Sequence, residues 1–197
     1  NFEMDDKCAL VVEIQGIAHR DENLRIGVEK YFVSGGMLIN TKNWKKNNIS
    51  SEVFRLLNSK KHFVYPDMDI LNIALENKVI FINYNYQYQY SISYSIDAEN
   101  RPSMITIPSN VKILHYTGAV KPWNKIVYSF LSVKPFIDIM HLSEWNDIKL
   151  YEPNHYKQIH KAARLAKKEG NIKEMLYWYA KYSMAKIKYL LRRKNDE

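Results

Sequence analysis

The sequence contains very little cysteine, glycine or proline, and it has no long hydrophobic run. One cysteine among 197 residues excludes a disulfide framework or a thiolate zinc cluster and predicts a reducing compartment. Six glycines and six prolines exclude collagen-like and low-complexity structure. No apolar stretch reaches the roughly 18 residues of a membrane span, so we expect no spanning helix. The 46% of hydrophobic residues is enough for a sizeable core and excludes disorder.

The net charge of +8 is concentrated at one end of the chain. Residues 1–155 carry 17 basic and 17 acidic side chains, whereas residues 156–197 carry 12 basic and 4 acidic ones. A neutral body with a basic tail predicts one acidic partner, bound at that end. Nucleic acid, an anionic membrane and a partner protein all satisfy this description.

Residues 1–150 alternate apolar runs typical of buried strands with stretches of helical spacing. The runs at 8–14, 79–82 and 111–114 predict strands, and residues 42–60 predict a helix. Pro66 predicts the start of another helix. Such alternation predicts an α/β fold, whose ligands bind beyond the carboxyl ends of the strands.

Residues 151–197 form the second predicted region, a basic helical extension. Residues 156–168 and 171–193 predict two helices separated by the helix-stop pair at Gly170. The basic charge and the apolar, tyrosine-rich flank fit a helix that lies on an anionic membrane. The alternative is a helical hairpin that packs this flank on the sheet domain and leaves its charges in water. We expect no nucleic-acid binding, because the aromatic residues follow helical spacing and no recognised motif is present.

Two local patterns interrupt the strand-like sequence. Gly35 and Gly36 break the apolar run at 31–40, which predicts a close backbone approach or a bulge. Tyrosines then occupy every second position of an extended segment, at Tyr84, Tyr86, Tyr88 and Tyr90. This alternation predicts an aromatic strand face packed on the core or, alternatively, a platform on which sugars stack.

The segment 115–123 carries the clearest chemistry. His115 leaves the predicted strand 111–114 and can bind a metal through a neutral ring nitrogen. Gly118 lets the backbone approach a phosphate, and Lys121 places a positive charge within reach of a pyrophosphate. Pro122 and Trp123 stiffen the turn. A histidine at a strand end is more often structural, but the ordered set is much more specific.

Three motifs together resemble a known family: residues 31–40, residues 67–72 and residues 115–123. The chain resembles the retaining glycosyltransferases of family 8, which have a GT-A fold and use a nucleotide-sugar donor with manganese. Within the family it is similar to the lipopolysaccharide core glucosyl- and galactosyltransferases of Gram-negative bacteria, which end in a comparable basic helical extension. The resemblance covers nearly all of residues 5–190.

The resemblance assigns roles to matching positions. His115 corresponds to the histidine that ligates the metal, Mn²⁺ or alternatively Mg²⁺, beside two carboxylates of a D-x-D motif. Gly35, Gly118 and Lys121 correspond to donor contacts. Asp67 and Asp69 correspond to the catalytic acidic pair beside the donor sugar, where a carboxylate can stabilise oxocarbenium character.

Three positions depart from the family pattern. Val33 replaces an asparagine that faces the sugar, and Met68 replaces a glutamine where a covalent nucleophile would be sought. Apart from Asp67-Met68-Asp69, which the resemblance assigns to the acidic pair beside the sugar, no D-x-D occurs, and Asp5-Asp6 lacks the spacing. The chain also begins with Asn1, without a charged-then-apolar leader. We therefore expect the C-terminal portion of a GT-A fold, inactive or nearly so by itself.

The resemblance implies a function for the parent protein. We expect retaining transfer of a hexose from UDP-glucose or UDP-galactose to the lipopolysaccharide core, at the cytoplasmic face of the inner membrane, with residues 156–197 holding the enzyme there peripherally. The alternative is a non-catalytic remnant that acts as a membrane- or glycolipid-docking module.

Overall fold

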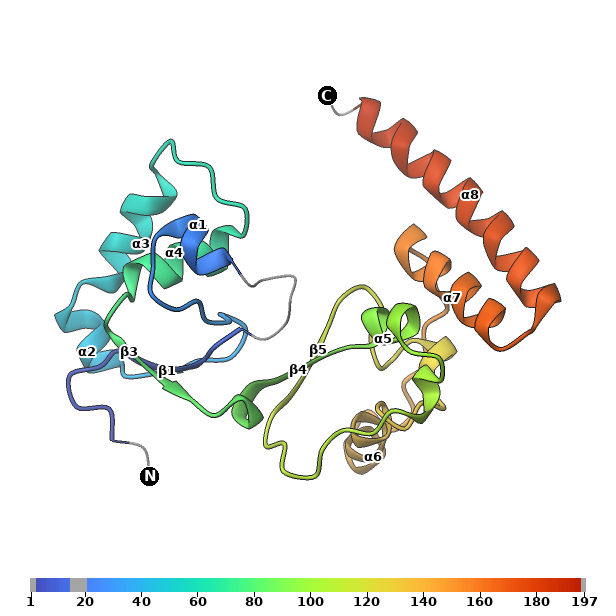
Figure 1. Cartoon of the computed structure of the whole chain (residues 1–197), viewed down its shortest axis with the longest axis horizontal. Helices are drawn as coiled ribbons and strands as arrows, with labels where there is room; N and C mark the ends of the chain where they lie inside the picture. Colours follow the sequence, from blue (N-terminus) through green and yellow to red (C-terminus); the bar gives the residue numbers. More distant parts are fainter. Residues whose placement is uncertain (1–2, 15–20, 196–197) are drawn as a thin grey trace. The chain divides into compact units, whose positions relative to one another are not determined.

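The computed structural model describes residues 3–14 and 21–195 and divides into two compact units (Figure 1). The first unit consists of Asn1–Tyr88 with Val111–Leu114, and the second of Gln89–Asn110 with His115–Glu197. These units are defined by packing and separate near residues 88 and 115. The predicted division into 1–150 and 151–197 stays a prediction about domain organisation.

A three-stranded sheet forms the centre of the first unit. Strand β1 (Ala9–Val12) pairs antiparallel with β2 (Leu38–Ile39) and parallel with β3 (Val79–Ile82). All four residues of β1 are buried, as the nearly continuous apolar run predicts. The parallel register joins Ala9 to Val79 and Val12 to Ile82, so β1 and β3 end at the same sheet edge.

Helices cover one side of this sheet. They are α1 (Glu22–Ile26), α2 (Thr41–Lys46), α3 (Ile49–Leu57) and α4 (Pro66–Ala74). Ile49 and Leu56 of α3 and Ile70 of α4 pack in one core with β1, and Figure 1 shows both helices on the same side of β1 and β3. The helix predicted from Pro66 is confirmed. The single helix predicted over 42–60 is wrong, because Asn48 adopts a left-handed conformation with φ of 51° and separates α2 from α3.

The tyrosine-rich segment is not extended throughout. Tyr84–Gln87 forms a 3₁₀ turn, and only Tyr88–Ser91 forms a strand, β4. The Asn83 side chain accepts a hydrogen bond of 2.9 Å from the backbone N–H of Asn85 and so fixes the turn. The predicted alternation is wrong over Tyr84–Gln87, and the four rings do not share one strand face.

The second unit contains most of a two-stranded sheet, with helices packed around it. Strand β4 pairs with β5 (Leu114–Thr117), and the chain continues through α5 (Ile92–Ala98) and α6 (Lys134–Leu142). Ile92 and Ile96 of α5 share a core with residues of the following loops and helices, namely Val120, Val127, Phe130, Val133, Ile137, Met140 and Leu165. The strand predicted at 111–114 is displaced, because β5 begins at Leu114 and contains His115 instead of ending before it.

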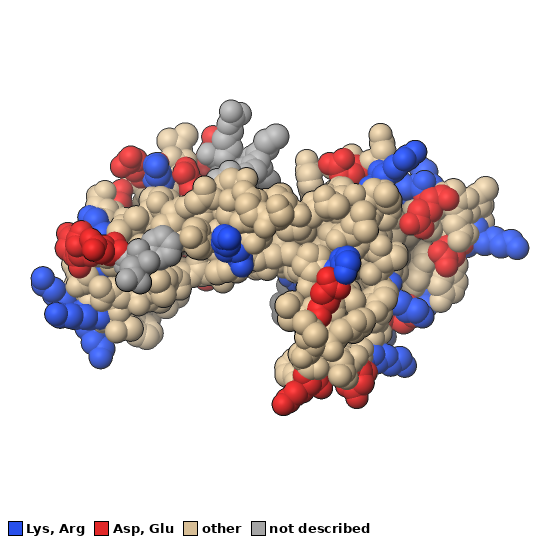
Figure 2. Space-filling model, turned by 90° about the horizontal axis from the view of Figure 1, so that it is seen from below, with Lys and Arg blue, Asp and Glu red and all other residues tan. Residues whose placement is uncertain are grey.

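The two helices predicted for the extension are confirmed as α7 (Tyr156–Lys168) and α8 (Ile172–Asn195). Gly170, with φ of 72°, ends α7. Leu165 of α7 enters the core of the second unit, whereas α8 stacks on α7 through ring contacts such as His160–Tyr182 at 4.6 Å. Among the described residues, no helix is long and apolar enough to cross a membrane. On the face drawn in Figure 2, basic and acidic side chains are interspersed without a continuous patch of either sign.

Candidate functional site

The first group of predicted site residues lies at the start of α4. Asp69 is fully buried, and each of its carboxylate oxygens accepts two hydrogen bonds. Arg25 donates to both oxygens, at 2.6 and 2.9 Å. The Tyr31 hydroxyl donates at 2.6 Å and the Tyr65 backbone N–H at 3.2 Å. Because a carboxylate offers about four acceptor positions, Asp69 has none left for a sugar hydroxyl in this arrangement.

The hydrogen bonds at Asp69 also determine its charge. Burial by itself would raise the pKa of Asp69, but the hydrogen bonds from Arg25, Tyr31 and the Tyr65 backbone outweigh it and lower the pKa below its usual value. Burial and the neighbouring carboxylate raise the pKa of Tyr31 in turn, so its hydroxyl keeps its proton. Sequence analysis did not find Arg25 or Tyr31 as partners, because both lie about 40 residues away along the chain.

Asp67 has a different environment from Asp69. Its carboxylate is exposed and accepts one hydrogen bond, from the Ser34 hydroxyl at 2.9 Å. Gly35, the predicted donor contact, follows Ser34 and is also exposed. Asp67 is therefore the member of the acidic pair with acceptor capacity to spare for a ligand. Met68 lies between the two and is half-buried.

The loop that carries Gly35 is held in place by two side-chain amides. Asn72 of α4 accepts from the Phe32 N–H at 2.8 Å and donates to the Phe32 carbonyl at 2.9 Å. With its nitrogen toward the Gly36 carbonyl, the Gln87 amide pairs with both backbone groups of Gly36, at 2.8 and 2.9 Å. A Cβ at Gly36 would lie 2.9 Å from the Gln87 side chain, so the close approach predicted at this glycine is confirmed. Val33 is buried and presents no polar group here.

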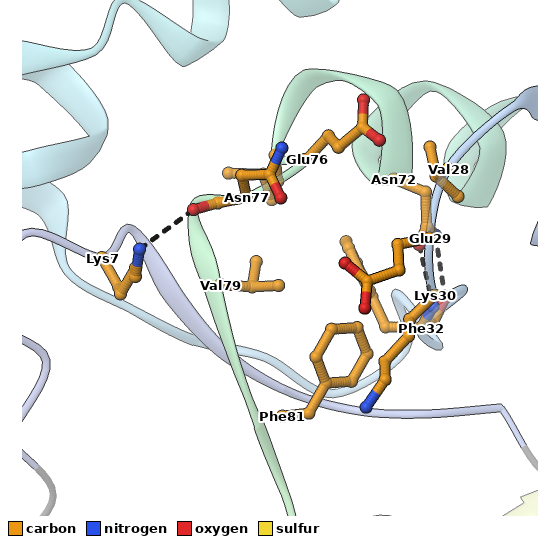
Figure 3. A pocket seen from close by; sticks show the side chains of 11 residues that line it. Lys7, Val28, Glu29, Lys30, Phe32, Asn72, Glu76, Asn77, Val79 and Phe81 are labelled. Carbon is orange, nitrogen blue, oxygen red and sulfur yellow. Dashed lines mark hydrogen bonds between the residues drawn. The ribbon is translucent and has the colours of Figure 1, made fainter.

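A cavity of about 270 Å³ lies elsewhere in the first unit, and Figure 3 shows its lining. Its walls combine carboxylates and cations, among them Glu29, Lys30 and Glu76, over an apolar floor that includes Phe81. The Lys30 ammonium lies 5.2 Å from the Phe81 ring centre. None of the predicted site residues lines this cavity.

The second group of predicted site residues lies on β5 and the turn that follows it. His115 is half-buried, and its Nδ1 is buried without a hydrogen-bond partner in the described part of the chain. Burial, together with the positive charge of Lys121, lowers the pKa of His115, so the ring is held neutral. A neutral imidazole with an unpaired nitrogen is the form in which histidine binds a metal.

The turn after β5 is fixed by the Ser93 side chain of α5 and by a side chain of the turn itself. Gly118 has φ of 82°, and a Cβ there would lie 3.0 Å from the Ser91 hydroxyl. The Ser93 hydroxyl accepts from the Val120 N–H at 3.0 Å. Asn124 accepts from the Lys121 N–H at 2.6 Å. Glycine is required at 118 by the backbone conformation and by the serine contact.

Lys121 extends back along the strand. Its ammonium donates to the Tyr116 carbonyl at 2.7 Å, while the Tyr116 hydroxyl donates to the Ser132 carbonyl at 2.7 Å. Burial raises the pKa of Tyr116 to about 12. The structure thus places the six predicted residues in two groups, with Gly35, Asp67 and Asp69 in the first unit and the other three, His115, Gly118 and Lys121, in the second.

The metal-binding potential of this set is partial. His115 fits a metal, because its Nδ1 is buried and unpaired and its ring is held neutral. Within residues 3–14 and 21–195, however, no cluster of three or more histidine, cysteine, aspartate or glutamate side chains could hold a metal ion. The described residues therefore offer one ligand where a hard cation needs several.

Comparison with solved structures identifies the fold. The chain is similar to LgtC, a galactosyltransferase solved in complex with donor and acceptor sugar analogues, at 23% identity and a TM-score of 0.54, over 73% of this chain and 55% of that chain. It is similar to the bifunctional glycosyltransferase WbbM at 18% identity and a TM-score of 0.54, over 74% and 30% of the two chains. The fold is that of the GT-A glycosyltransferases, followed by a helical C-terminal region, as predicted.

The sequence comparisons identify the family. Residues 1–127 match "Glycosyl transferase family 8" and residues 130–186 match "Glycosyl transferase family 8 C-terminal", so the chain belongs to glycosyltransferase family 8. The lipopolysaccharide glucosyltransferase WaaO of Escherichia coli K12 is 32% identical over 94% of this chain and 56% of its own length. A lipopolysaccharide 1,3-galactosyltransferase of Salmonella typhimurium is 27% identical over 81% of this chain and 47% of its own length. The chain thus spans about half the length of these curated relatives.

Proposed function

We propose that the protein containing this chain transfers a hexose, glucose or galactose, from a UDP-sugar to the lipopolysaccharide core, with retention and with the help of a metal ion. The observation that carries the proposal is the unpaired, neutral imidazole of His115, followed in sequence by Gly118 and Lys121. Family membership and relatives described as lipopolysaccharide glucosyl- and galactosyltransferases support the same reaction.

In this proposal, the second unit binds the leaving group. His115 would be one ligand of Mn²⁺ or Mg²⁺, and the remaining ligands would come from a D-x-D motif outside these residues. Bound there, the metal would neutralise charge on the departing diphosphate. Lys121 contributes a fixed positive charge to the same end. The turn that contains Gly118, where Ser93 accepts from the Val120 N–H, keeps the backbone shape that this contact needs.

The first unit would bind the sugar. Asp67 is exposed and able to accept bonds from sugar hydroxyls, while Asp69 acts as a positioning residue that holds Arg25 and Tyr31. Met68 offers no group that could form a covalent glycosyl bond. We therefore favour front-face displacement, in which the departing diphosphate takes the proton of the acceptor hydroxyl.

Assays of the full-length parent and of this chain alone test the reaction. The parent should transfer glucose or galactose from the UDP-sugar to truncated lipopolysaccharide core acceptors, and product NMR should show a retained anomeric configuration. His115→Ala in the parent should abolish metal-dependent turnover and leave the circular dichroism spectrum unchanged. The chain alone should show almost no turnover; turnover by the isolated chain would contradict the proposed need for further metal ligands.

A second candidate function, docking to an anionic membrane at the cytoplasmic face, is favoured by α8. The helix exposes an apolar face beyond the tyrosines that contact α7; its most exposed members include Ile172, Leu176, Met184, Ile187 and Leu191. Exposed lysines such as Lys173 and Lys188 accompany this face. An apolar face flanked by cations suits a helix in the headgroup region, where each cation contributes about 1 kcal/mol. Docking is compatible with a catalytic role of the protein. It is also the function that a non-catalytic remnant would keep.

Vesicle co-sedimentation of the full chain tests docking. Lys173→Glu with Lys188→Glu should weaken binding to anionic vesicles, and Met184→Ser should weaken it at every salt concentration. The matched controls are Lys60→Glu and Leu142→Ser, which change exposed residues away from α8. Equal binding of all variants, or binding that is insensitive to salt, would contradict the docking role.

A further inference from the structure

The second unit contains a cavity of about 600 Å³ that none of the predicted site residues lines. Its walls come from α6, from the segment between α6 and α7, and from the turn after Lys121. Four of the eleven lining residues are aromatic, namely Trp123, Phe136, Trp145 and Tyr151. The volume falls in the range of small-molecule sites in proteins.

Three of these rings remain open to solvent although they line one cavity. Trp145 is 67% exposed, Tyr151 57% and Trp123 40%. Large aromatic side chains gain free energy when they are covered, and exposed aromatic surface gathered around one hollow marks a place where something binds. The cavity therefore has the exposed aromatic surface that is typical of a binding site.

The cavity lies next to the turn that carries Lys121, one of the proposed leaving-group contacts. Trp123 lies two residues after Lys121, and its ring packs on Phe136 at 6.0 Å between centres. The backbone of Tyr151 is paired with the same turn, since its N–H donates to the Trp123 carbonyl at 3.0 Å and its carbonyl accepts from the Lys125 N–H at 2.9 Å. Two walls of the cavity are thus fixed relative to each other.

The chemistry of the lining limits what can bind. No lining side chain is charged, which argues against phosphates and nucleotides. The indole nitrogens of Trp123 and Trp145 and the Tyr151 hydroxyl donate no hydrogen bond to any described residue. An acyl chain would cover these groups and leave them unpaired, at about 1–3 kcal/mol each. A sugar ring offers an apolar face for stacking and hydroxyls for the polar edges.

We propose that this cavity is an accessory subsite for a neutral saccharide, formed by Trp123, Trp145 and Tyr151, with the Asn154 amide at its polar side. Its assignment to the glycan acceptor rests on the proposed function; saccharide binding itself does not. The subsite would hold sugar units of the acceptor away from the reacting hydroxyl and so contribute binding and specificity.

Binding can be measured directly on the full chain, without turnover. The probes are maltotriose and lactose as neutral saccharides, with laurate as the acyl-chain alternative. Indole N–H signals in heteronuclear NMR spectra report on all four tryptophans. Saccharide should shift the signals of Trp123 and Trp145, while those of Trp44 and Trp178, which lie outside the cavity, serve as internal references.

Variants separate the cavity from the rest of the surface. Trp145→Ala should weaken saccharide binding about tenfold, as expected for a central aromatic contact, and Trp145→Phe should recover most of it. Leu142→Ala is the matched control, because Leu142 is exposed nearby but does not line the cavity. The thermal midpoint of each variant verifies that it is folded.

The outcomes are distinct. Saccharide-dependent shifts of Trp123 and Trp145 in the wild type support the subsite if the Trp123 shift is lost in Trp145→Ala and both shifts are kept in Leu142→Ala. No saccharide binding, or laurate binding at the same residues in its place, overturns it. If the parent shows no hexosyl transfer while saccharide binding persists, the proposed function fails and the subsite remains. If the parent transfers a hexose but the cavity binds no saccharide, the subsite proposal fails and the proposed function remains.

Discussion

Two of the predicted site residues, Asp69 in the first unit and His115 in the second, differ in how their buried polar atoms are paired. In the first, both oxygens of Asp69 are saturated by Arg25, Tyr31 and the Tyr65 backbone. In the second, the buried Nδ1 of His115 has no partner among the described residues. A saturated buried cluster stabilises a fold, whereas an unpaired buried group costs free energy that a ligand can recover. The comparison distinguishes a saturated carboxylate from an unpaired imidazole in two motifs that sequence alone treats alike.

Removing the carboxylate of Asp69 should have the largest effect on stability among the changes considered. Asp69→Asn should lower the free energy of unfolding by about 3 kcal/mol, because it leaves the Arg25 cation without its buried partner. Urea denaturation measures the change. Asp67→Asn is the matched control and should cost less than about 0.5 kcal/mol, since Asp67 is exposed. A loss in Asp69→Asn as small as that in Asp67→Asn would show that Asp69 is not structural.

The Gly118 turn provides the next largest effect, this time in the second unit. Gly118→Ala should lower the free energy of unfolding by about 2 kcal/mol, because the residue has positive φ and its Cβ would press on Ser91. Gly27→Ala is the control, with φ of 79° and no atom within 4 Å of a new Cβ, and should cost about 1 kcal/mol. The difference isolates the serine contact. Equal losses of unfolding free energy in the two variants would mean that the turn accommodates the new methyl group without strain.

The pH dependence of stability should sharpen the contrast. The pKa of Asp69 is lower in the folded chain than in the unfolded chain, whose value is about 3.9. The stabilisation is therefore complete above about pH 4 and is lost as the pH falls further, because the unfolded chain takes up the proton first. Thermal midpoints measured between neutral and acidic pH should fall more gently in Asp69→Asn than in the wild type. An unchanged slope would be evidence against this linkage.

The smallest effect on stability is expected at His115. His115→Ala should change the free energy of unfolding by no more than about 1 kcal/mol, because the ring is half-buried and its Nδ1 gives up no hydrogen bond. Asp69→Asn should act mainly on stability, and His115→Ala mainly on metal-dependent turnover in the parent. A large loss of stability in His115→Ala would assign the histidine to the scaffold.

Sequence patterns predicted the elements that depend on local signals. The buried run of β1, the proline at the start of α4 and the glycine after α7 each act within a few residues, and all three elements are present. The helix break at Asn48 and the 3₁₀ turn after Asn83 were missed, because an asparagine can replace regular structure through its own conformation or side-chain hydrogen bond.

The candidate site was predicted as a set of residue types rather than as an arrangement. The arrangement of the motif 115–123 is determined by contacts between residues close in sequence, since Lys121 donates to the Tyr116 carbonyl and Asn124 accepts from the Lys121 N–H. The arrangement of the acidic pair depends on a distant residue. Asp69 differs from Asp67 because it bonds to Arg25, which lies 44 positions before Asp69 in a polar stretch without a recognisable pattern. Contacts of that range depend on the folded packing, and a single sequence does not show them.

Side chains of α7 bond to the backbone at the end of α5 and in the turn after β5, and these bonds have a consequence for local opening. Gln158 donates to the Ala119 carbonyl at 2.9 Å, and Lys168 donates to the Asp97 and Glu99 carbonyls at the end of α5, at 3.0 and 2.5 Å. The amide hydrogens of α7 should therefore exchange with deuterium only when the core of the second unit opens. In α8, no residue up to Leu191 is buried, so its amides should exchange through fraying. The two helices of the basic extension should therefore differ in exchange rate. Helix α7 belongs to the cooperative core, whereas α8 can unwind while that core stays closed.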